Sequence, residues 1–538
     1  MSFEEEGTDR VLEPLRFYDP HALHRSQIDD QISHLREQLR NLLLARNTLL
    51  PISTIPNEIL STIFLMSQLN YYRAYKVEMR PLLALTWVCH NWRTIALSAA
   101  SLWTYIGKEN LHWSAECLIR SKQAPLQVSL TFDDPSILDI GATILSQIHR
   151  FRKLQLNFGD PTESPFGAAE RFENILTQPA PMLESFSLAY ATVSTPLFSR
   201  VFPQLRTVHL SWVDITWGWG PNLLPFGNLT HLSITIPDRG IPVTNFLEAL
   251  SPTLPNLENL QLIYVFTSSP SSHNTCTALP TPVCIPNIKS FILWCSKVSP
   301  MLEFFNSCRL GPFVTGRVDM MAGEGETVLN FLDVLRASEE LERRSITSVQ
   351  VNHRSAPNAT LSIIFNQTQN VQDSFRFDFN HRLSWSEIIP IFPSLPVHNI
   401  TTLTLRMPSL SMANWTQLFV TFTRLEELEL EEESTVNSFI QFIISSTPDD
   451  FDGTRVMDTE SIQLLPFKCL RKLTLARYLF EEESYPDYRA FCTALKVRRS
   501  IGLRLQQLWL REDRASRLDL LKEVVDEVKI LDQPLLLF

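Results

Sequence analysis

A recurring spacing of apolar residues constrains the fold of most of this chain. From about Gln127 onward, one motif carries apolar residues at its first, fourth and sixth positions. Its copies are Phe151-Leu154-Leu156, Leu183-Phe186-Leu188, Leu205-Val208-Leu210, Leu229-Leu232-Ile234, Leu257-Leu260-Leu262, Ile288-Phe291-Leu293, Ile346-Val349-Val351, Ile400-Leu403-Leu405, Leu425-Leu428-Leu430, Leu470-Leu473-Leu475 and Leu505-Leu508-Leu510. The last two positions point to the same side of a short strand. One such unit cannot bury its apolar side alone, but a stack of units can.

The intervals between the motifs predict helices and turns. The predicted helices are Ala168–Leu176, Val243–Leu250, Glu326–Ala337 and a closing helix over Ser516–Leu531. The intervals from Leu293 to Ile346 and from Val351 to Ile400 are about two repeats long. There Leu361–Phe365 and Phe375–Phe379 are candidate strands of an antiparallel hairpin. The sequence therefore predicts an α/β fold built as a stack.

This repeated stretch resembles an irregular leucine-rich repeat domain. Several copies begin with proline, as in FPQLRTVHL, LPNLENLQL and IPNIKSFIL, and the period is roughly that of leucine-rich repeats, 20–29 residues. The asparagine or cysteine that follows the third apolar position in regular repeats is mostly missing. The resemblance implies a solenoid with an irregular middle, and we assign residues 107–538 to it.

Residues 51–106 predict a cluster of short helices. Pro56 suits the first turn of a helix, and Ile59, Leu60, Ile63 and Phe64 recur at helical spacing. A second helix follows from Pro81. About fifty residues bury only part of such an apolar surface, so some of it is expected to meet a partner or the next domain.

This helical stretch resembles an F-box. The matching blocks are Ile55-Pro56-x-Glu58-Ile59-Leu60-x-x-Ile63-Phe64, Val88-Cys89-x-x-Trp92-Arg93 and Leu102-Trp103. Ile55 replaces the usual leucine, and the loop Asn70–Arg80 is longer than in compact F-boxes. Similar inserts occur in F-box proteins expanded in mushroom-forming fungi.

Residues 1–50 form an N-terminal segment with one predicted helix, His24–Leu50. Its apolar residues alternate at spacings of four and three, the period of a coiled coil; they are Ile28, Ile32, Leu35, Leu39 and Leu42. Two interpretations remain open. The helix folds back on the following helices, which we favour, or it is a short dimerisation helix.

Composition and motifs exclude several classes of function. The net charge of −11 argues against binding nucleic acid by phosphate neutralisation. No apolar run reaches the length of a membrane span, and the acidic start is unlike a signal peptide. We therefore expect a cytoplasmic or nuclear protein. The eight cysteines form no CxxC pair, which predicts free thiols in a reducing compartment and no zinc site.

We find no catalytic signature in the sequence. It contains no P-loop, GxSxG, HExxH or kinase motif. We expect no enzymatic activity, no cofactor and no metal. The alternation within each strand instead predicts a polar face with scattered tryptophans, as in protein recognition. Its candidate substrate-binding residues are Trp294, Glu427, Glu429 and Glu431. The three glutamates are expected to repel one another, and a Lys- or Arg-bearing partner would relieve that repulsion. The alternatives are a solvated acidic face and internal neutralisation by the Arg406 and Lys472 strands.

Together the two resemblances imply the substrate-recognition subunit of an SCF-type ubiquitin ligase. In that family the F-box binds a Skp-type adaptor, and through it a cullin, while the repeats bind a protein substrate. The adaptor-binding surface that the resemblance implies consists of Ile55, Pro56, Ile59, Leu60, Ile63, Phe64, Leu83, Val88, Cys89, Trp92 and Trp103. The alternative is a leucine-rich-repeat scaffold that acts outside a ubiquitin ligase.

Overall fold

The protein divides into two compact units, Met1–Ala124 and Pro125–Phe538. Residues 107–124, which we had assigned to the repeats, thus lie in the helical unit. The computed structural model describes residues 21–75, 80–132, 134, 137–159, 178–193, 202–215, 228–236, 240–251, 253–267, 281–311, 315–321, 328–337, 346–353, 359–366, 374–381, 388–389, 392, 400–406, 410–446, 466–475, 485–510 and 519–530.

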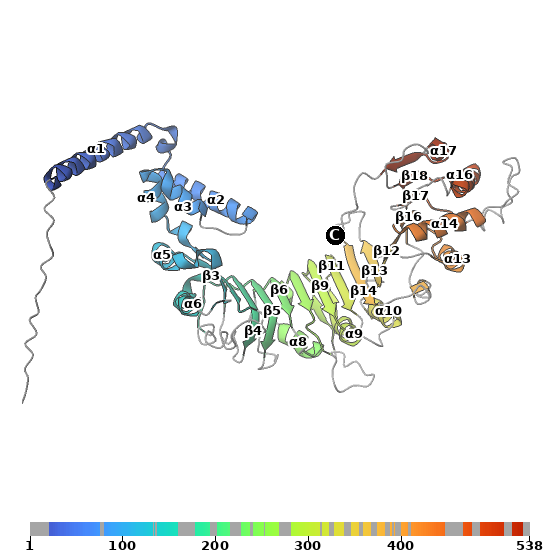
Figure 1. Cartoon of the computed structure of the whole chain (residues 1–538). Coiled ribbons are helices and arrows are strands. Elements are labelled where there is room, and N and C mark those ends of the chain that lie inside the picture. Colours follow the sequence, from blue (N-terminus) through green and yellow to red (C-terminus); the bar gives the residue numbers. More distant parts are fainter. Residues whose placement is uncertain are drawn as a thin grey trace, which may run out of the picture. The chain divides into compact units, whose positions relative to one another are not determined.

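The first unit is mainly helical (Figure 1). Its elements are α1 (Ala22–Thr48), η1 (Pro51–Thr54), α2 (Asn57–Tyr75), α3 (Arg80–Val88), α4 (His90–Ser98), η2 (Ala100–Trp103), β1 (Tyr105–Ile106), η3 (Lys108–Trp113) and α5 (Ser114–Arg120). The sequence prediction of several short helices over residues 51–106 is confirmed.

Aromatic side chains hold the short helices together. The ring of Phe64 on α2 lies 4.8 Å from that of Trp92 on α4, measured between centroids. Trp103 is buried, and its Nε1–H donates to the carbonyl oxygen of Ala96 at 2.9 Å. Cys89 caps α4, because its Sγ accepts the backbone N–H of Trp92 at 3.5 Å. These contacts join α2, α4 and η2 around one small core.

Helix α1 confirms the helix predicted for His24–Leu50, but its apolar stripe is uncovered. Ile28 and Ile32 are 41% and 39% exposed, and Leu35 and Leu42 are 62% and 69% exposed. The expectation that α1 folds back on the following helices was therefore wrong. The dimerisation hypothesis stays a prediction.

The second unit is built on one long sheet whose first strands follow each other in chain order and are parallel. These strands are β2 (Leu126–Thr131), β3 (Phe151–Asn157), β4 (Ser185–Val193), β5 (Thr207–Ile215), β6 (His231–Thr235), β7 (Asn259–Ile263), β9 (Ser290–Cys295) and β11 (Thr315–Met321). A small separate sheet pairs β8 (Val283–Ile285) with β10 (Cys308–Leu310).

The strand order inverts after β11. The next strand in space is β14 (Ser374–His381), parallel to β11, followed by β13 (Ala359–Asn366) and β12 (Ile346–His353). The predicted hairpin is confirmed, since β13 and β14 pair antiparallel with Leu361 opposite Phe379. Strand β13 is antiparallel to both of its neighbours, β12 and β14.

Chain order resumes from β12 onward with parallel strands. These are β15 (Thr402–Arg406), β16 (Glu427–Leu430), β17 (Lys472–Leu475), β18 (Gln507–Leu510) and β19 (Glu527–Ile530). The prediction of a closing helix over Ser516–Leu531 was wrong for its C-terminal part, which is a strand. The described part has a short helix α17 (Asp519–Lys522), and then β19 adds a strand to the sheet edge beside β18.

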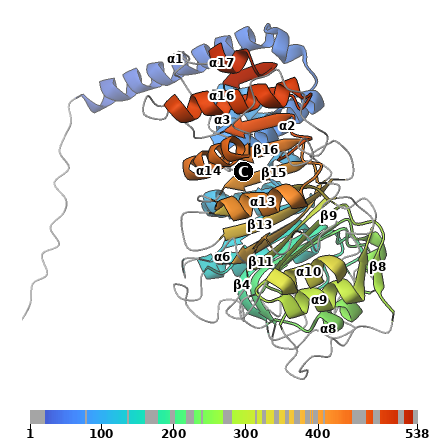
Figure 2. The ribbon, with the colours of Figure 1, turned by 90° about the vertical axis from the view of Figure 1, so that its right-hand side faces the viewer.

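Helices lie along one face of the sheet (Figure 2). They include α6 (Ile137–Leu145), α8 (Val243–Leu250), α9 (Val298–Ser307), α10 (Val328–Ala337), α13 (Met412–Thr421), α14 (Glu433–Ser445) and α16 (Tyr485–Ser500). The predicted helix Val243–Leu250 is confirmed, and α10 confirms most of Glu326–Ala337; Ala168–Leu176 lies outside the described residues.

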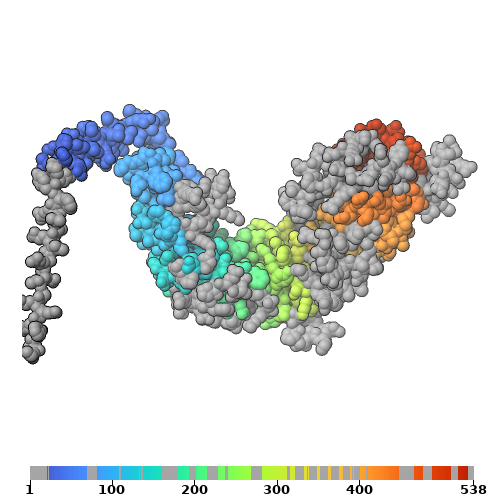
Figure 3. All heavy atoms as spheres, viewed as in Figure 1, coloured from blue at the N-terminus to red at the C-terminus, as the bar shows by residue number. Residues whose placement is uncertain are grey.

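The repeated apolar residues form the core between sheet and helices. Every motif residue whose burial is described is buried, and the motifs lie in register across the strands, as Leu232 pairs with Val208 and Leu260. The green and yellow repeats pack directly against one another (Figure 3). The chain is thus a mixed helix-and-sheet protein. The opposite face of the sheet, here called the open face, carries the residues that alternate with the core.

Strand β11 was missed because glycine stands at its apolar position. Gly316 pairs with Phe291 on one side and Phe375 on the other. The two phenylalanine rings stack across it at 6.3 Å between centroids and 17° between planes. The neighbouring rings therefore fill the space that a side chain at Gly316 would occupy.

Candidate functional site

The helical unit separates the predicted adaptor-binding residues into core and surface. Leu60, Phe64 and Trp103 are at most 2% exposed, so they pack the core and are not available to a partner. Ile55, Leu83, Cys89 and Trp92 are half-buried, and Pro56, Ile59, Ile63 and Val88 are exposed.

The exposed apolar residues form a stripe along α2. Ile59, Ile63 and Met66 follow one another at spacings of four and three and are 52%, 45% and 55% exposed. Residues at these spacings share one face of a helix. Exposed isoleucine and methionine in a row are unusual on a surface without a partner. This stripe is the candidate adaptor site in the first unit.

Two exposed residues were missing from the sequence prediction. Trp87 at the end of α3 is 76% exposed, and Met66 extends the α2 stripe by one turn. Met66 could have been found because it continues the helical spacing. Trp87 directly precedes Val88 in the Val88-Cys89 block, but nothing in that pattern says which of the neighbouring apolar side chains points outward.

The predicted glutamates lie on the open face, and each one has a partner within the sheet. Lys472 Nζ lies 3.2 Å from Glu427 Oε2, and Thr404 Oγ1 donates to Glu429 Oε2 at 3.1 Å. Arg406 Nε lies 2.6 Å from Glu431 Oε1. The structure therefore fits internal neutralisation of the acidic strand rather than unrelieved repulsion.

Trp509 lies beside these residues and contacts two lysines. The ammonium groups of Lys472 and Lys529 lie 4.9 and 5.3 Å from the centroid of its ring. Cations above an indole face are attracted by its quadrupole. The indole N–H of Trp509 is buried without a hydrogen-bond partner.

A cluster of four charged residues lies where the strand order inverts. Arg317 and Asp319 on β11 are the register partners of Arg376 and Asp378 on β14. The two carboxylates are almost fully buried, with 5% and 1% of their side chains exposed, whereas the arginine side chains are 51% and 30% exposed. Buried charges require such pairing.

Each guanidinium of this cluster is held by carboxylates. Arg317 Nε lies 2.8 Å from Asp319 Oδ2 and 3.0 Å from Asp378 Oδ2. Arg376 Nε donates to Asp378 Oδ1 at 2.7 Å, and its Nη2 donates to Ser362 Oγ at 3.0 Å. Burial, and then the charge of Asp378, raise the pKa of Asp319 to about 6 against the opposing effect of Arg317.

Two aromatic residues extend this cluster along the open face. Trp294 on β9 is the register partner of Asp319, and its indole N–H is buried without a hydrogen-bond partner. Tyr264 contacts Trp294 edge to face, with ring centroids 6.4 Å apart. Burial and the charge of Asp319 raise the pKa of Tyr264. Trp294, predicted as a recognition residue, therefore adjoins the charged cluster, whereas the predicted glutamates lie on β16 or directly after it.

Three aromatic residues of the second unit have a left-handed backbone conformation. Tyr190, Trp212 and Tyr264 have φ angles of 55°, 57° and 55°. Bulky residues rarely adopt this left-handed conformation. Tyr190 and Trp212 lie side by side, with ring centroids 6.2 Å apart and planes 8° from parallel, and Trp212 is 47% exposed. The apolar motif could not predict these left-handed residues, because it ends before them.

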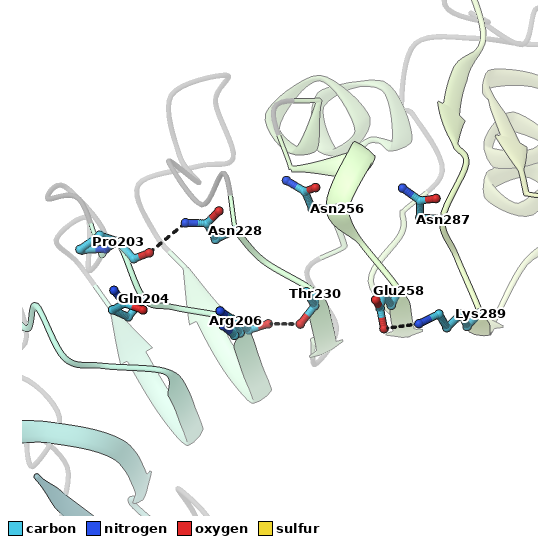
Figure 4. Close-up of a pocket in the computed structure, with 9 residues that line it drawn as sticks. All are labelled: Pro203, Gln204, Arg206, Asn228, Thr230, Asn256, Glu258, Asn287 and Lys289. Carbon is cyan, nitrogen blue, oxygen red and sulfur yellow. Dashed lines mark hydrogen bonds and ion pairs between the residues drawn. The ribbon is translucent and has the colours of Figure 1, made fainter.

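A polar groove of about 570 Å³ follows the turns that precede β5, β6, β7 and β9 (Figure 4). Asn228 Nδ2 donates to the carbonyl oxygen of Pro203 at 2.9 Å, and Thr230 Oγ1 donates to that of Arg206 at 3.1 Å. Lys289 Nζ lies 2.8 Å from Glu258 Oε2. These bonds each join one repeat to the next, so the side chains that line the groove are tied to neighbouring turns.

Reactive groups do not converge in the part of the chain that the structure describes. Within it no three His, Cys, Asp or Glu side chains are placed to hold a metal ion. Burial raises the pKa of Cys117 and of Cys295 to about 12, which keeps these thiols protonated. None of the described helices is long and apolar enough to cross a membrane.

Comparison with known proteins adds no assignment. A scan of the sequence against protein-family models finds no match, and a search of curated proteins finds no similar sequence.

Proposed function

We propose that this chain is the substrate-recognition subunit of an SCF-type ubiquitin ligase. In this proposal the helical unit is an F-box that binds a Skp-type adaptor, and the second unit is an irregular leucine-rich repeat domain that binds a protein substrate. The observation that carries the proposal is the stripe of Ile59, Ile63 and Met66, which remains exposed beside a well-packed core.

The energetics favour a partner on this stripe. Covering apolar surface contributes about 25 cal/mol for each Å² removed from water. The exposed parts of these three side chains are lined up on one helix, so one partner surface can cover them together. Trp87 and Val88 at the end of α3 offer further exposed apolar area, 76% and 58%. Aromatic residues of this kind commonly dominate binding energy.

The second unit supports recognition rather than catalysis. Its open face presents tryptophan, arginine and paired charges on rigid strands, a composition typical of protein interfaces. A receptor of this kind performs no bond chemistry. It raises the effective concentration of a substrate near the transferring enzyme.

The alternative is a leucine-rich-repeat scaffold outside a ubiquitin ligase. Affinity purification of the tagged full chain and of a chain lacking residues 51–106, followed by mass spectrometry, separates the two. The proposal predicts that a Skp-type adaptor and a cullin accompany the full chain and are lost with residues 51–106. Recovery of neither protein with the full chain favours the scaffold.

A further inference from the structure

The charged cluster at the inversion of strand order places two guanidinium groups side by side on the open face. Arg317 and Arg376 are register partners on adjacent parallel strands, which lie about 4.8 Å apart. Like charges at this spacing repel each other. The two carboxylates beneath them, Asp319 and Asp378, relieve that repulsion and fix both side chains.

The contacts that fix the arginines leave one edge of each unused. Arg317 uses Nε and Nη2, the latter donating to Asp319 Oδ1 at 3.1 Å. Arg376 also uses Nε and Nη2, toward Asp378 and Ser362. Among the described residues, Nη1 of neither arginine has a partner. Each Nη1 carries two N–H donors, and the two side chains are 51% and 30% exposed.

We propose that Arg317 and Arg376 form a binding site for an acidic segment of a partner protein, whose carboxylate or phosphate oxygens accept hydrogen bonds from the two guanidinium groups. The inference rests on the proposed recognition function of the open face and names the chemistry of its partner. Planar guanidinium groups suit this role because they bind carboxylate and phosphate through paired, charge-assisted hydrogen bonds.

The burial pattern favours an anion over a cation at this site. The carboxylates of the cluster have 5% and 1% of their side chains exposed and face Arg317 and Arg376, so a cationic ligand could not reach them. The arginines are the exposed members. Trp294, the register partner of Asp319, is half-buried and adds an aromatic surface beside this cluster.

The pair of Lys472 and Glu427 on the open face lacks this arrangement. Lys472 faces Glu427, whose side chain is 46% exposed, more than the 30% of the lysine. An approaching anion would meet a carboxylate there. This pair therefore provides a matched control on the same face of the same sheet.

The test is fluorescence anisotropy with the full chain and three labelled probes: a hexaglutamate peptide, a phosphoserine peptide and a neutral hexaglutamine peptide. We expect saturable binding of the two acidic probes and none of the neutral one. The charge-balanced change Arg317→Gln/Asp319→Asn should weaken acidic-probe binding about tenfold or more. The control Lys472→Gln/Glu427→Gln should keep it within about twofold.

A single substitution tests the same site in the opposite direction. Asp319→Asn leaves both arginines and removes one compensating charge, so it should bind the acidic probes more tightly. If the double variant does not fold, binding by Asp319→Asn alone tests whether the two arginines bind acidic probes. Unchanged or weaker binding by Asp319→Asn, equal losses in the two double variants, or no saturable binding of either acidic probe would overturn the proposal. A preference between the acidic probes identifies phosphate or carboxylate as the group recognised.

Failure of this site is distinguishable from failure of the ligase proposal. The adaptor site lies on α2 in the first unit, and the arginines lie in the second. If the chain binds acidic probes but captures no adaptor, only the ligase proposal is contradicted. Capture of an adaptor by a chain that binds no acidic probe would contradict this inference alone.

Discussion

Replacing Asp319 by asparagine is expected to stabilise the protein at neutral pH. Burial and Asp378 raise the pKa of Asp319 to about 6 from an ordinary 3.8. Since each pKa unit corresponds to about 1.4 kcal/mol, the ionised carboxylate costs up to about 3 kcal/mol of folding free energy at pH 7. The side chain is 5% exposed, so solvent screens this cost little.

The sign of the pH dependence follows from the raised pKa. The folded chain binds this proton more tightly than the unfolded chain, so the stabilisation is fully present below about pH 3.8. It is lost as pH rises to about 6. Asp319→Asn keeps a neutral side chain at every pH, so its advantage over the wild type should be near zero at pH 4 and largest at pH 7.

Urea unfolding at pH 4 and pH 7, followed by tryptophan fluorescence, measures this difference. Asp139→Asn is the control, because Asp139 is an exposed carboxylate in the first turn of α6, where loss of its charge costs at most about 1 kcal/mol. A variant that is destabilised at pH 7, or that differs from the wild type equally at both pH values, would refute the account of the buried pair.

Other substitutions test the core, the surface and the stack. Leu60→Ala should destabilise the helical unit by about 2–5 kcal/mol in thermal melts, whereas Trp87→Ala should leave the melt within about 0.5 kcal/mol and weaken adaptor capture; the reverse pattern would contradict the division into core and surface. Gly316→Ala places a Cβ 2.7 Å from the Phe375 ring and should cost about 1–3 kcal/mol in urea unfolding, and an unchanged midpoint would contradict this packing. A chain ending at residue 410 loses β16, which pairs with β15, and should aggregate in light scattering; a soluble, cooperatively folding fragment would indicate a domain boundary there.

The sequence was sufficient for those parts of the fold where one residue type repeats at one position. Leu428 and Leu473 follow the motif, and both lie in the core on neighbouring parallel strands. The motif did not predict β11, because Gly316 stands at its apolar position and the rings of Phe291 and Phe375 on the adjacent strands fill the space there. It also failed for β19, where the apolar residues of Glu527–Ile530 fit a helix as well as a strand, and pairing with β18 decides the outcome.

The candidate sites were less predictable than the fold. Spacing shows that Ile59 and Leu60 both belong to an apolar helix, but only packing shows that Ile59 is exposed and Leu60 buried. The charged cluster joins β11 and β14, which are far apart in sequence and adjacent only because the strand order inverts. No local pattern could have placed Asp319 beside Asp378.

The central claim is that the stripe on α2 binds a Skp-type adaptor, and equilibrium binding of purified adaptor tests it most directly. Ile59→Asp/Ile63→Asp places two charges on this surface, each of which costs several kcal/mol when desolvated, so affinity should fall by roughly a hundredfold or more. Ile119→Asp is the control, because Ile119 on α5 is 71% exposed in the same unit, and it should bind as the wild type does. If the double variant has the circular dichroism spectrum and melting temperature of the wild type and binds the adaptor with equal affinity, the α2 stripe is not the adaptor site.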